Sequence, residues 1–483
     1  MKIVLRFFPE MIIKSREVRQ RHIGVLRRSL RTQLALIDPR MRLSGGWDGL
    51  TIETGDAEPA LLERMLRLLT HTPGIDAVLE VQQYPLEDIA ALAERVSLHY
   101  APLLAGKRFA ARCKRVGQHA FSSMAVERAI GAAILAKVPS ARVDLERPEV
   151  LVRVAIRDDE VMLVERSHAG LGGYPLGTQD AVLSLISGGF DSTVASFLCI
   201  KRGLLTHYCF FRLGGAEHEF AVKEVALFLW LKYGASHRVK FVTVPFEEVV
   251  EEIVAKVENS QMGVVLKRMM LRAASHVAER LKVETLLTGE SVSQVASQTL
   301  ANLAVIDRAT DKLILRPLAL MNKREIIDIA RAIGTEALVQ NVPEYCGVIS
   351  VRPSTRAGLQ KVVAEEAEVA DTVVQAALAR AEYQMIDRVM EGVAKHVPLV
   401  PPPQAETAVI IDIRHPSEEE QNPLRISDAS RPVLKIPFYE LRTRFAALPP
   451  SQSYLLYCEK GFMSRLHATH LQERGHGNVG VYQ

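Results

Sequence analysis

The sequence has few cysteines, few aromatic residues and no long hydrophobic run, and these shortages exclude several classes of protein. Its five cysteines among 483 residues include no C-x-x-C pair and leave one unpaired, so neither a secreted disulfide framework nor a zinc site is expected. No apolar run approaches the roughly 18 residues of a membrane span. Charged residues interrupt the amino-terminal segment at Lys2 and Arg6, unlike a signal peptide. We expect a cytoplasmic protein without a membrane partner.

The charge that is present is unevenly distributed. The formal net charge is only +4, but the first 50 residues hold eleven lysines and arginines against four acidic residues. A second stretch, from Lys107 to Arg115, carries five positive charges and no acid. Such clusters are typical of proteins that bind a polyanion, although a solvated surface explains either one alone. Because both lie in the N-terminal third, we expect this part to bind RNA. Aromatic residues, at 6%, favour recognition of phosphate and shape over base stacking.

Alternating strand-like and helix-like segments predict a multidomain α/β protein, and the length predicts about three domains. The N-terminal third fits two small α/β units. A glycine-rich segment, Gly170 to Gly177, is predicted to be a hinge, and a parallel sheet follows it. Val397 to Pro403 form a polyproline-like spacer before a last small domain. The clearest predicted elements are strands over 2–8, 182–186, 207–212, 239–244 and 285–288, and helices over 16–36, 193–201, 264–281 and 465–473.

A loop rich in glycine and serine joins one predicted strand to a helix. The strand Val182–Ile186 runs into Ser187-Gly188-Gly189-Phe190-Asp191-Ser192, and the helix is expected from Thr193. Two glycines let the backbone approach an anion closely, and the start of the helix adds amide donors. An ordinary strand-to-helix turn explains the glycines but not the two serines and Asp191. We therefore interpret the loop as a phosphate-binding site.

This loop resembles the S-G-G-x-D-S signature of the PP-loop ATPases, which cleave ATP between the α and β phosphates and adenylate an oxygen of their substrate. The family includes asparagine and NAD synthetases as well as tRNA lysidine and thiouridine synthases, so the loop alone leaves the substrate open. The resemblance implies that Asp191 is linked to Mg²⁺. It also implies that ATP is bound by Leu185, Ile186, Ser187, Gly188, Gly189, Asp191 and Ser192.

A second segment narrows the substrate. The residues Thr288 to Leu300, TGESVSQVASQTL, resemble the T-G-E-S-x-G-Q-V-A-S-Q-T segment of the tRNA 4-thiouridine synthases. That resemblance implies that Gly289 and Gln298 help to bind ATP and that Lys267, on a predicted helix, neutralises phosphate charge. A solvated helix residue is the alternative for Lys267. Ser293 stands where the family usually has glycine, which puts the backbone geometry there in question.

The resemblance to this family continues over most of the chain, through Ile13–Arg16, Cys113–His119, Phe121–Ser123 and Thr178–Asp180. It implies that the N-terminal domains hold tRNA with uridine 8 near ATP. The basic stretch supplies the candidate tRNA-binding residues, Lys107, Arg108, Arg112, Lys114 and Arg115. The resemblance also implies five parts: an N-terminal ferredoxin-like domain (1–62), a THUMP RNA-binding domain (63–170), a PP-loop ATP pyrophosphatase domain (175–396), a Pro-rich linker (397–405) and a rhodanese-like domain (406–483).

Cys458 occupies a position that favours a reactive thiol. It follows the predicted strand Tyr454–Tyr457 and precedes a helix, where amide donors and the helix dipole favour a thiolate. The segment resembles the loop of a rhodanese, which carries a cysteine persulfide. A cysteine phosphatase is the competing interpretation, but its C-x5-R pattern would place arginine at the position of Ser464. We expect Cys458 to carry sulfur.

The remaining cysteines divide into one candidate and three packing residues. Cys113, Cys199 and Cys209 are expected to have structural roles. For Cys346 the family resemblance implies a second catalytic thiol, which forms a disulfide with Cys458 after sulfur transfer.

The resemblance as a whole implies ATP-dependent conversion of uridine 8 to 4-thiouridine. A cysteine desulfurase is the implied persulfide donor, and a small sulfur-carrier protein of thiamine synthesis is an additional partner. Two alternatives stay open, namely a persulfide carrier for thiamine synthesis only and a PP-loop tRNA ligase such as lysidine synthase.

Overall fold

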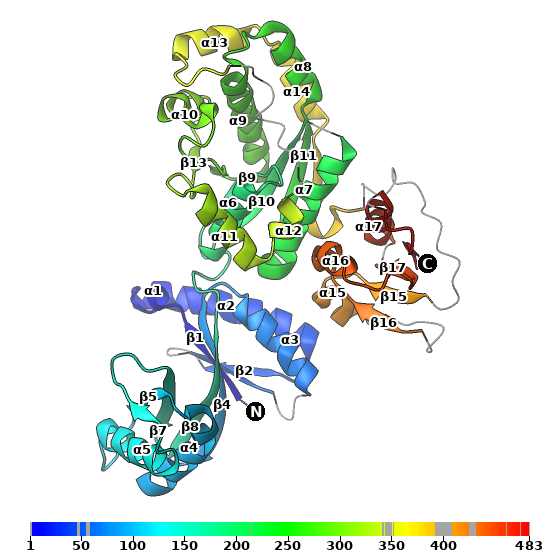
Figure 1. Ribbon diagram of the computed structural model, residues 1–483. Coiled ribbons are helices and arrows are strands. Elements are labelled where there is room, and N and C mark those ends of the chain that lie inside the picture. Colours follow the sequence, from blue (N-terminus) through cyan, green and yellow to red (C-terminus); the bar gives the residue numbers. More distant parts are fainter. Residues whose placement is uncertain are drawn as a thin grey trace. The chain divides into compact units, whose positions relative to one another are not determined.

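The computed structural model describes two compact units, residues 1–174 and 175–483 (Figure 1). The described residues are 2–45, 49–54, 58–213, 215–340, 342, 350, 352–391, 408–424, 431–459, 461–473 and 475–482. Within this described part, no helix is long and apolar enough to cross a membrane.

The first unit contains one mixed sheet with helices packed on it. Its described elements are β1 (Lys2–Phe7), α1 (Pro9–Ile12), α2 (Arg16–Ile37), β2 (Arg42–Gly45), β3 (Leu50–Glu53), α3 (Pro59–Thr70), β4 (Ile75–Pro85), α4 (Ile89–Leu104), β5 (Arg108–Val116), α5 (Ser123–Lys137), β6 (Arg142–Val143), β7 (Val150–Arg157) and β8 (Glu160–Ala169).

The eight described strands of this sheet follow the order β2-β3-β1-β4-β8-β7-β5-β6. Two large hydrophobic cores form on it, one beneath α2 and α3 and one beneath α4 and α5, and a smaller cluster lies on β4 and β8. The long strands β4 and β8 pair from Ala77–Ala169 to Pro85–Glu160, and so join the two halves into a single sheet. The boundary predicted between residues 62 and 63 falls within α3; the domain boundaries remain predictions.

The second unit begins with a mostly parallel sheet. The elements up to residue 391 are β9 (Ala181–Leu185), α6 (Phe190–Lys201), β10 (Leu205–Arg212), α7 (Ala216–Leu229), a π-helical turn (Trp230–Gly234), β11 (Lys240–Pro245), α8 (Glu247–Lys256), α9 (Met262–Leu281), β12 (Thr285–Leu287), a 3₁₀ turn (Ala296–Gln298), α10 (Leu300–Asp307), β13 (Leu313–Leu315), α11 (Lys323–Ile333), α12 (Glu336–Val339), α13 (Leu359–Ala367), α14 (Asp371–Ala379), β14 (Glu382–Met385) and a 3₁₀ turn (Ile386–Arg388).

This sheet has the order β13-β12-β9-β10-β11-β14, in which only β14 is antiparallel among the described strands. Side chains of β9 alternate between two cores: Val182 packs with α6 and α11, and Leu183 packs with α8 and α9. The chain runs outward from β9 to β11 and then returns to place β12 on the other side of β9. The strand order therefore reverses between β9 and β12, and ligands of such sheets bind at the carboxyl ends of the strands at this reversal.

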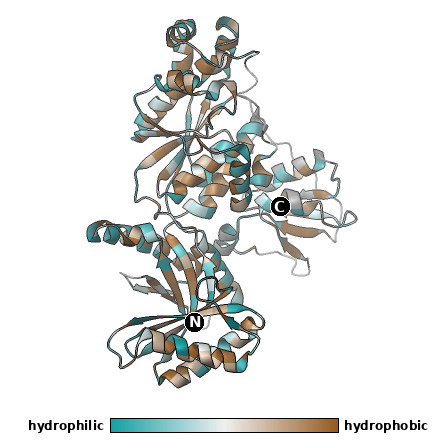
Figure 2. Ribbon diagram, turned by 60° about the vertical axis from the view of Figure 1, so that its left-hand side comes forward, coloured by the Kyte–Doolittle hydropathy of each residue, from teal (hydrophilic) through white to brown (hydrophobic). Residues whose placement is uncertain are grey.

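A separate four-stranded parallel sheet lies in the C-terminal part, with the order β16-β15-β17-β18 among the described strands. Figure 2 shows hydrophobic residues concentrated on strands of the sheets. The elements are β15 (Val409–Asp412), α15 (Pro416–Gln421), β16 (Val433–Lys435), α16 (Phe438–Phe445), β17 (Tyr454–Tyr457), α17 (Phe462–Glu473) and β18 (Val479–Val481). The predicted Pro-rich linker, residues 397–405, lies outside the described residues.

The predicted α/β class with parallel sheets is confirmed, and the predicted elements match closely. One difference affects the candidate site: α6 begins at Phe190 rather than Thr193. Gly189 is the residue before the helix, so Asp191 and Ser192 lie in its first turn instead of in the loop. Their side chains are consequently held by helical geometry.

Candidate nucleotide and sulfur-transfer sites

The Ser187–Ser192 loop lies where β9 ends, at the reversal of strand order. Ser187 donates its backbone N–H to Ser192 Oγ at 3.1 Å, and the two Oγ atoms lie 3.0 Å apart. Gly188 has φ +80°, and a Cβ there would lie 2.9 Å from Val222 Cγ2, so both conformation and space require glycine. The glycine keeps the loop tight against α7 and leaves its backbone bare, as a phosphate-binding turn requires.

The segment Thr288–Leu300 begins directly beside this loop. The strand β12, which ends just before it, pairs with β9, with Leu287 opposite Ser184. A Cβ on Gly289 would lie 2.5 Å from both the carbonyl carbon of Asp191 and the amide nitrogen of Ser192. The two sequence motifs therefore form one site, and Gly289 lets their backbones approach each other.

Asp191 accepts hydrogen bonds from two residues that sequence reasoning missed. Gln294 Nε2 donates to Asp191 Oδ2 at 2.7 Å, and Lys323 Nζ lies 2.8 Å from Asp191 Oδ1. Lys323 is the first residue of α11, and its ammonium lies 5.6 Å from the centre of the Phe190 ring. The sequence did carry a signal, because Asn322 and Glu325 form a capping box that marks this helix start. The site therefore has a second lysine besides Lys267.

Asp191, which is predicted to be linked to Mg²⁺, has room for one bond to an ion that arrives with ATP. The described residues hold no group of three or more histidine, cysteine or acidic side chains that could bind a metal. A carboxylate has about four lone-pair positions, of which the two donors occupy two. Asp191 can thus supply one ligand, while phosphate oxygens and water supply the others, as is usual for Mg²⁺.

Lys267 and Gln298, both predicted to bind ATP, lie on different elements near the loop. Lys267 projects from α9 and its Nζ lies 2.7 Å from Glu290 Oε1, so it is not a freely solvated lysine. Gln298 Oε1 is buried and accepts no hydrogen bond within the described structure. A buried acceptor without a partner is costly unless a ligand supplies the donor. The role of Gln298 in binding ATP remains a prediction.

Ser293 adopts the left-handed conformation that its family position suggests. Its φ is +66°, and its N–H donates to the Gln298 carbonyl at 2.9 Å. A non-glycine residue pays a steric cost there, which explains why glycine suits this position. The backbone turn is kept in spite of the serine.

The N-terminal turn of α17 and the end of β17 surround the Cys458 thiol. The Ser464 N–H donates to Cys458 Sγ at 3.3 Å, and Ser464 Oγ lies 3.4 Å from the same sulfur. Arg414 and Asp412 form a buried pair, 2.6 Å apart, beside Tyr457. The sulfur therefore lies at the start of a helix with an amide donor aimed at it, in the position that the sequence predicted. The rhodanese-like identity of this part remains a prediction.

The other described cysteines are buried and are not in disulfides. Burial, aided by the Glu127 charge, raises the pKa of Cys113 to about 11. Burial also raises the pKa of Cys199 to about 12 and that of Cys209 still further. Such thiols stay protonated at neutral pH, in line with the structural roles expected for them. Cys346 lies outside the described residues, so its pairing with Cys458 remains a prediction.

The basic stretch Lys107–Arg115 falls mostly on β5. Arg108 pairs with Asp144 and Glu149, both at 3.2 Å, and Arg112 donates to the Leu145 carbonyl at 2.9 Å. The side chains at 108, 112 and 114 are exposed, while alternate residues Phe109, Ala111 and Cys113 face the core beneath α4 and α5. The charges of Arg108, Arg112 and Lys114 therefore lie on the face opposite the helices. Its contact with tRNA remains a prediction.

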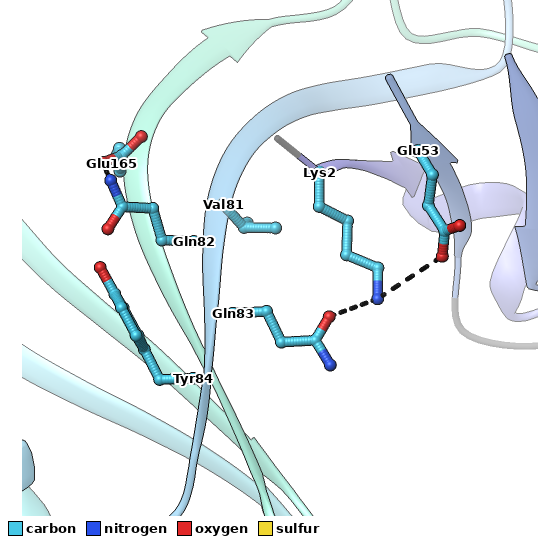
Figure 3. Close-up of a pocket in the computed structure, with 7 residues that line it drawn as sticks. All are labelled: Lys2, Glu53, Val81, Gln82, Gln83, Tyr84 and Glu165. Atoms are coloured by element: carbon cyan, nitrogen blue, oxygen red, sulfur yellow. Dashed lines mark hydrogen bonds and ion pairs between the residues drawn. The ribbon is translucent and has the colours of Figure 1, made fainter. Parts of the chain in front are cut away.

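The first unit also has an open hollow of about 560 Å³ on its sheet (Figure 3). Lys2 Nζ lies 2.5 Å from Gln83 Oε1 and 4.0 Å from Glu53 Oε1, so its charge is already partnered. None of the residues predicted to bind or react lines it; its lining residues are Lys2, Glu53, Val81, Gln82, Gln83, Tyr84 and Glu165.

The fold and the first site define an α/β protein with a PP-loop where the order of its parallel strands reverses. The family model described as Thiamine biosynthesis protein (ThiI) matches residues 177–370, and the THUMP domain model matches residues 85–164. The tRNA sulfurtransferases of Azotobacter vinelandii (strain DJ / ATCC BAA-1303) and Pseudomonas fluorescens (strain Pf0-1) are 51% and 50% identical over 484 residues, covering 100% of each chain. The chain belongs to the tRNA sulfurtransferase family, as its sequence motifs predict.

Solved structures share the fold at lower identity. A 4-thiouridine synthetase–RNA complex with bound ATP has a TM-score of 0.66 at 22% identity, covering 80% of this chain and 99% of that one. PH1313 from Pyrococcus horikoshii OT3 has a TM-score of 0.51 at 15% identity, covering 69% of this chain and 100% of that one.

Proposed function

We propose that this chain uses ATP to convert uridine 8 of tRNA to 4-thiouridine, with sulfur delivered as a persulfide on Cys458. The observation that carries the proposal is the packing of Gly289 against Asp191 and Ser192, which unites the phosphate loop with the segment typical of 4-thiouridine synthases. Family membership supports the same reaction, and a protein of similar fold was solved with RNA and ATP bound.

The first step activates the uridine. Uridine O4 attacks the α phosphorus of ATP, and pyrophosphate leaves, so the base carries an adenylate at O4. The loop amides of Ser187–Ser192 and the ammonium of Lys267 would stabilise the phosphates. Mg²⁺ accompanying ATP would neutralise phosphate charge with Asp191 as a ligand. Gln298, which the family resemblance assigns to the ATP site, would contact the nucleotide as well.

The second step replaces oxygen by sulfur. The terminal sulfur of the Cys458 persulfide attacks C4, and AMP leaves with O4. A thiolate at Cys346 then attacks Cys458 Sγ, which forms a Cys346–Cys458 disulfide and releases 4-thiouridine. The sulfane sulfur gains the two electrons that the two thiols lose. A dithiol reductant reopens the disulfide, and a cysteine desulfurase reloads Cys458, in the cytoplasm.

Mass analysis of tRNA after reaction with persulfide and ATP tests this proposal. Asp191→Ala and Cys458→Ala are expected to abolish thiolation, whereas Cys199→Ala, which removes a buried thiol, should retain it after correction for stability. Full thiolation by either of the first two variants would refute the mechanism. Addition of lysine mass instead of sulfur would indicate a tRNA ligase.

A second role, sulfur delivery to a small carrier protein for thiamine synthesis, is favoured by the match to the family described as Thiamine biosynthesis protein (ThiI). This role needs the Cys458 persulfide but no adenylation. Cells whose only copy is Asp191→Ala should grow without thiamine, while Cys458→Ala cells should not. Thiamine dependence of both strains would tie this role to the ATP site as well.

A further inference from the structure

Glu290 is a buried carboxylate held between two cations at the edge of the nucleotide site. It is 8% exposed and follows Gly289, which packs on the phosphate loop. Its Oε1 lies 2.7 Å from Lys267 Nζ, and its Oε2 accepts from Arg316 Nε at 2.7 Å. Thr288 Oγ1 also donates to Oε2, at 3.1 Å. The carboxylate thus accepts three hydrogen bonds, from α9, from the residue after β13 and from the residue after β12.

The two cations differ in what they have left to offer. Arg316 uses Nε for Glu290 and both terminal nitrogens for Asp307, so three of its five N–H groups are committed. The Lys267 ammonium has three N–H groups, of which one serves Glu290. Two remain for other acceptors. Arg316 therefore holds Glu290 and Asp307 together, and Lys267 is the cation that has the larger share of its N–H groups left for a ligand.

A purely structural role does not account for this carboxylate. Burial raises the pKa of Glu290, but the charges of Lys267 and Arg316 outweigh it and lower the pKa to about 2, so the group is ionised at neutral pH. Asp307 already neutralises Arg316. The particular contribution of Glu290 is then to order Lys267, a side chain that loses much rotamer freedom when it is fixed.

We propose that Glu290 is a positioning residue for ATP, which fixes the Lys267 ammonium beside the phosphate loop with one hydrogen bond and leaves two for phosphate oxygens. The inference rests on the proposed function, because it needs ATP at the Ser187–Ser192 loop. The ordering of Lys267 before ATP arrives removes part of the entropic cost of binding. A side chain held by a second residue acts as part of a preorganised site.

A double-mutant cycle on the full chain tests the proposal. Calorimetry with ATP would compare the unaltered protein, Glu290→Gln, Lys267→Met and the double variant. Glu290→Gln is expected to weaken ATP binding roughly tenfold, and the double variant should bind no more weakly than Lys267→Met. In thiolation assays the KM for ATP should rise more than kcat falls. Equal weakening by Glu290→Gln with and without Lys267 would overturn the proposal.

Glu366→Gln is the matched control. Glu366 is a buried carboxylate on α13. It pairs with Arg268 and Arg272, which lie on α9 as Lys267 does, at 2.8 and 2.9 Å. Its loss should lower thermal stability without weakening ATP binding; an equal effect on ATP binding would mean that α9 is merely loosened, and would overturn the proposal. Should Glu290→Gln fail to fold, Glu290→Asp keeps the charge but shortens the reach. Unchanged ATP binding in that variant would likewise contradict the proposal. No ATP binding by the unaltered protein would instead refute the proposed function.

Discussion

Two nearby residues of the second unit, Gly289 and Ser293, differ in whether their backbone leaves room for a side chain. Gly289 must lack a side chain because the backbone of Asp191 and Ser192 fills the space where Cβ would be. Four residues later, Ser293 has a side chain in a conformation that favours glycine. Position 289 therefore cannot accept a Cβ atom, whereas loss of the side chain at position 293 should increase stability.

Gly289→Ala should disrupt the nucleotide site. Its Cβ would overlap atoms that belong to the phosphate-loop backbone, so we expect ATP binding to fall more than tenfold and the free energy of unfolding to drop by about 1–3 kcal/mol. Calorimetry and denaturant titration measure the two effects. Gly263→Ala on α9, with no atom within 4 Å of the new Cβ, is the control and should be neutral or stabilising. Normal ATP binding by Gly289→Ala would show that the two segments can separate.

Ser293→Gly should stabilise the protein by a few tenths to about 1 kcal/mol, because glycine relieves the left-handed strain. The control is Lys282→Gly, a second left-handed position at the end of α9, for which a similar gain is expected. Denaturant midpoints would compare the two. A loss of stability at Ser293 alone would mean that its side chain makes a contact that outweighs the strain.

Among the secondary-structure elements, the starts of helices and the ends of strands hold the candidate functional residues. The phosphate loop leads into α6, Lys323 opens α11, and Cys458 precedes α17. Local patterns predicted most of these elements, including β17 at Tyr454–Tyr457, because alternation and caps are short-range signals. They did not predict the Lys323–Asp191 pair, whose members are 132 positions apart and meet only through the sheet order. The Glu290–Arg316 pair was missed for the same reason.

Removal of the α11 cap should affect stability and chemistry together. Asn322→Ala loses the side-chain hydrogen bond to the Glu325 N–H and should cost about 1 kcal/mol. ATP-dependent thiolation should also fall, because Lys323 follows the cap directly. Asp88→Ala, which removes the cap of α4 in the first unit, should cost similar stability and leave ATP binding intact. If both variants retained ATP-dependent activity equally, Lys323 would not depend on its cap.

The exposed lysines around β5 should contribute to tRNA affinity through their charge. Lys107→Gln and Lys114→Gln are each expected to weaken tRNA binding and to lower the slope of log affinity against log salt by about 1. Filter binding across a salt series measures this slope. Lys256→Gln on α8, whose ammonium already pairs with Glu252, is the charge-matched control. Unchanged slopes in the β5 variants would place the RNA elsewhere.

The whole molecule consists of two units with separate cores, and this separation allows them to be tested apart. Residues 1–174 contain the cores beneath α2–α3 and α4–α5, and residues 175–483 contain those around β9. We expect each piece to fold alone, the first binding tRNA without regard to ATP and the second binding ATP. Circular dichroism and binding assays on the two pieces would check this. Aggregation of the first piece, or ATP-dependent RNA binding by it, would contradict the division.

The pairing of β4 with β8 also limits how the first unit can move. These strands pair from one α/β half into the other, with one shift of register between Glu80 and Val81, so their hydrogen bonds tie the two halves together. The distance from the basic helix α2 to the charges on β5 should therefore vary little. We therefore expect an RNA that contacts both α2 and β5 to be selected by the spacing of its phosphates rather than by its sequence.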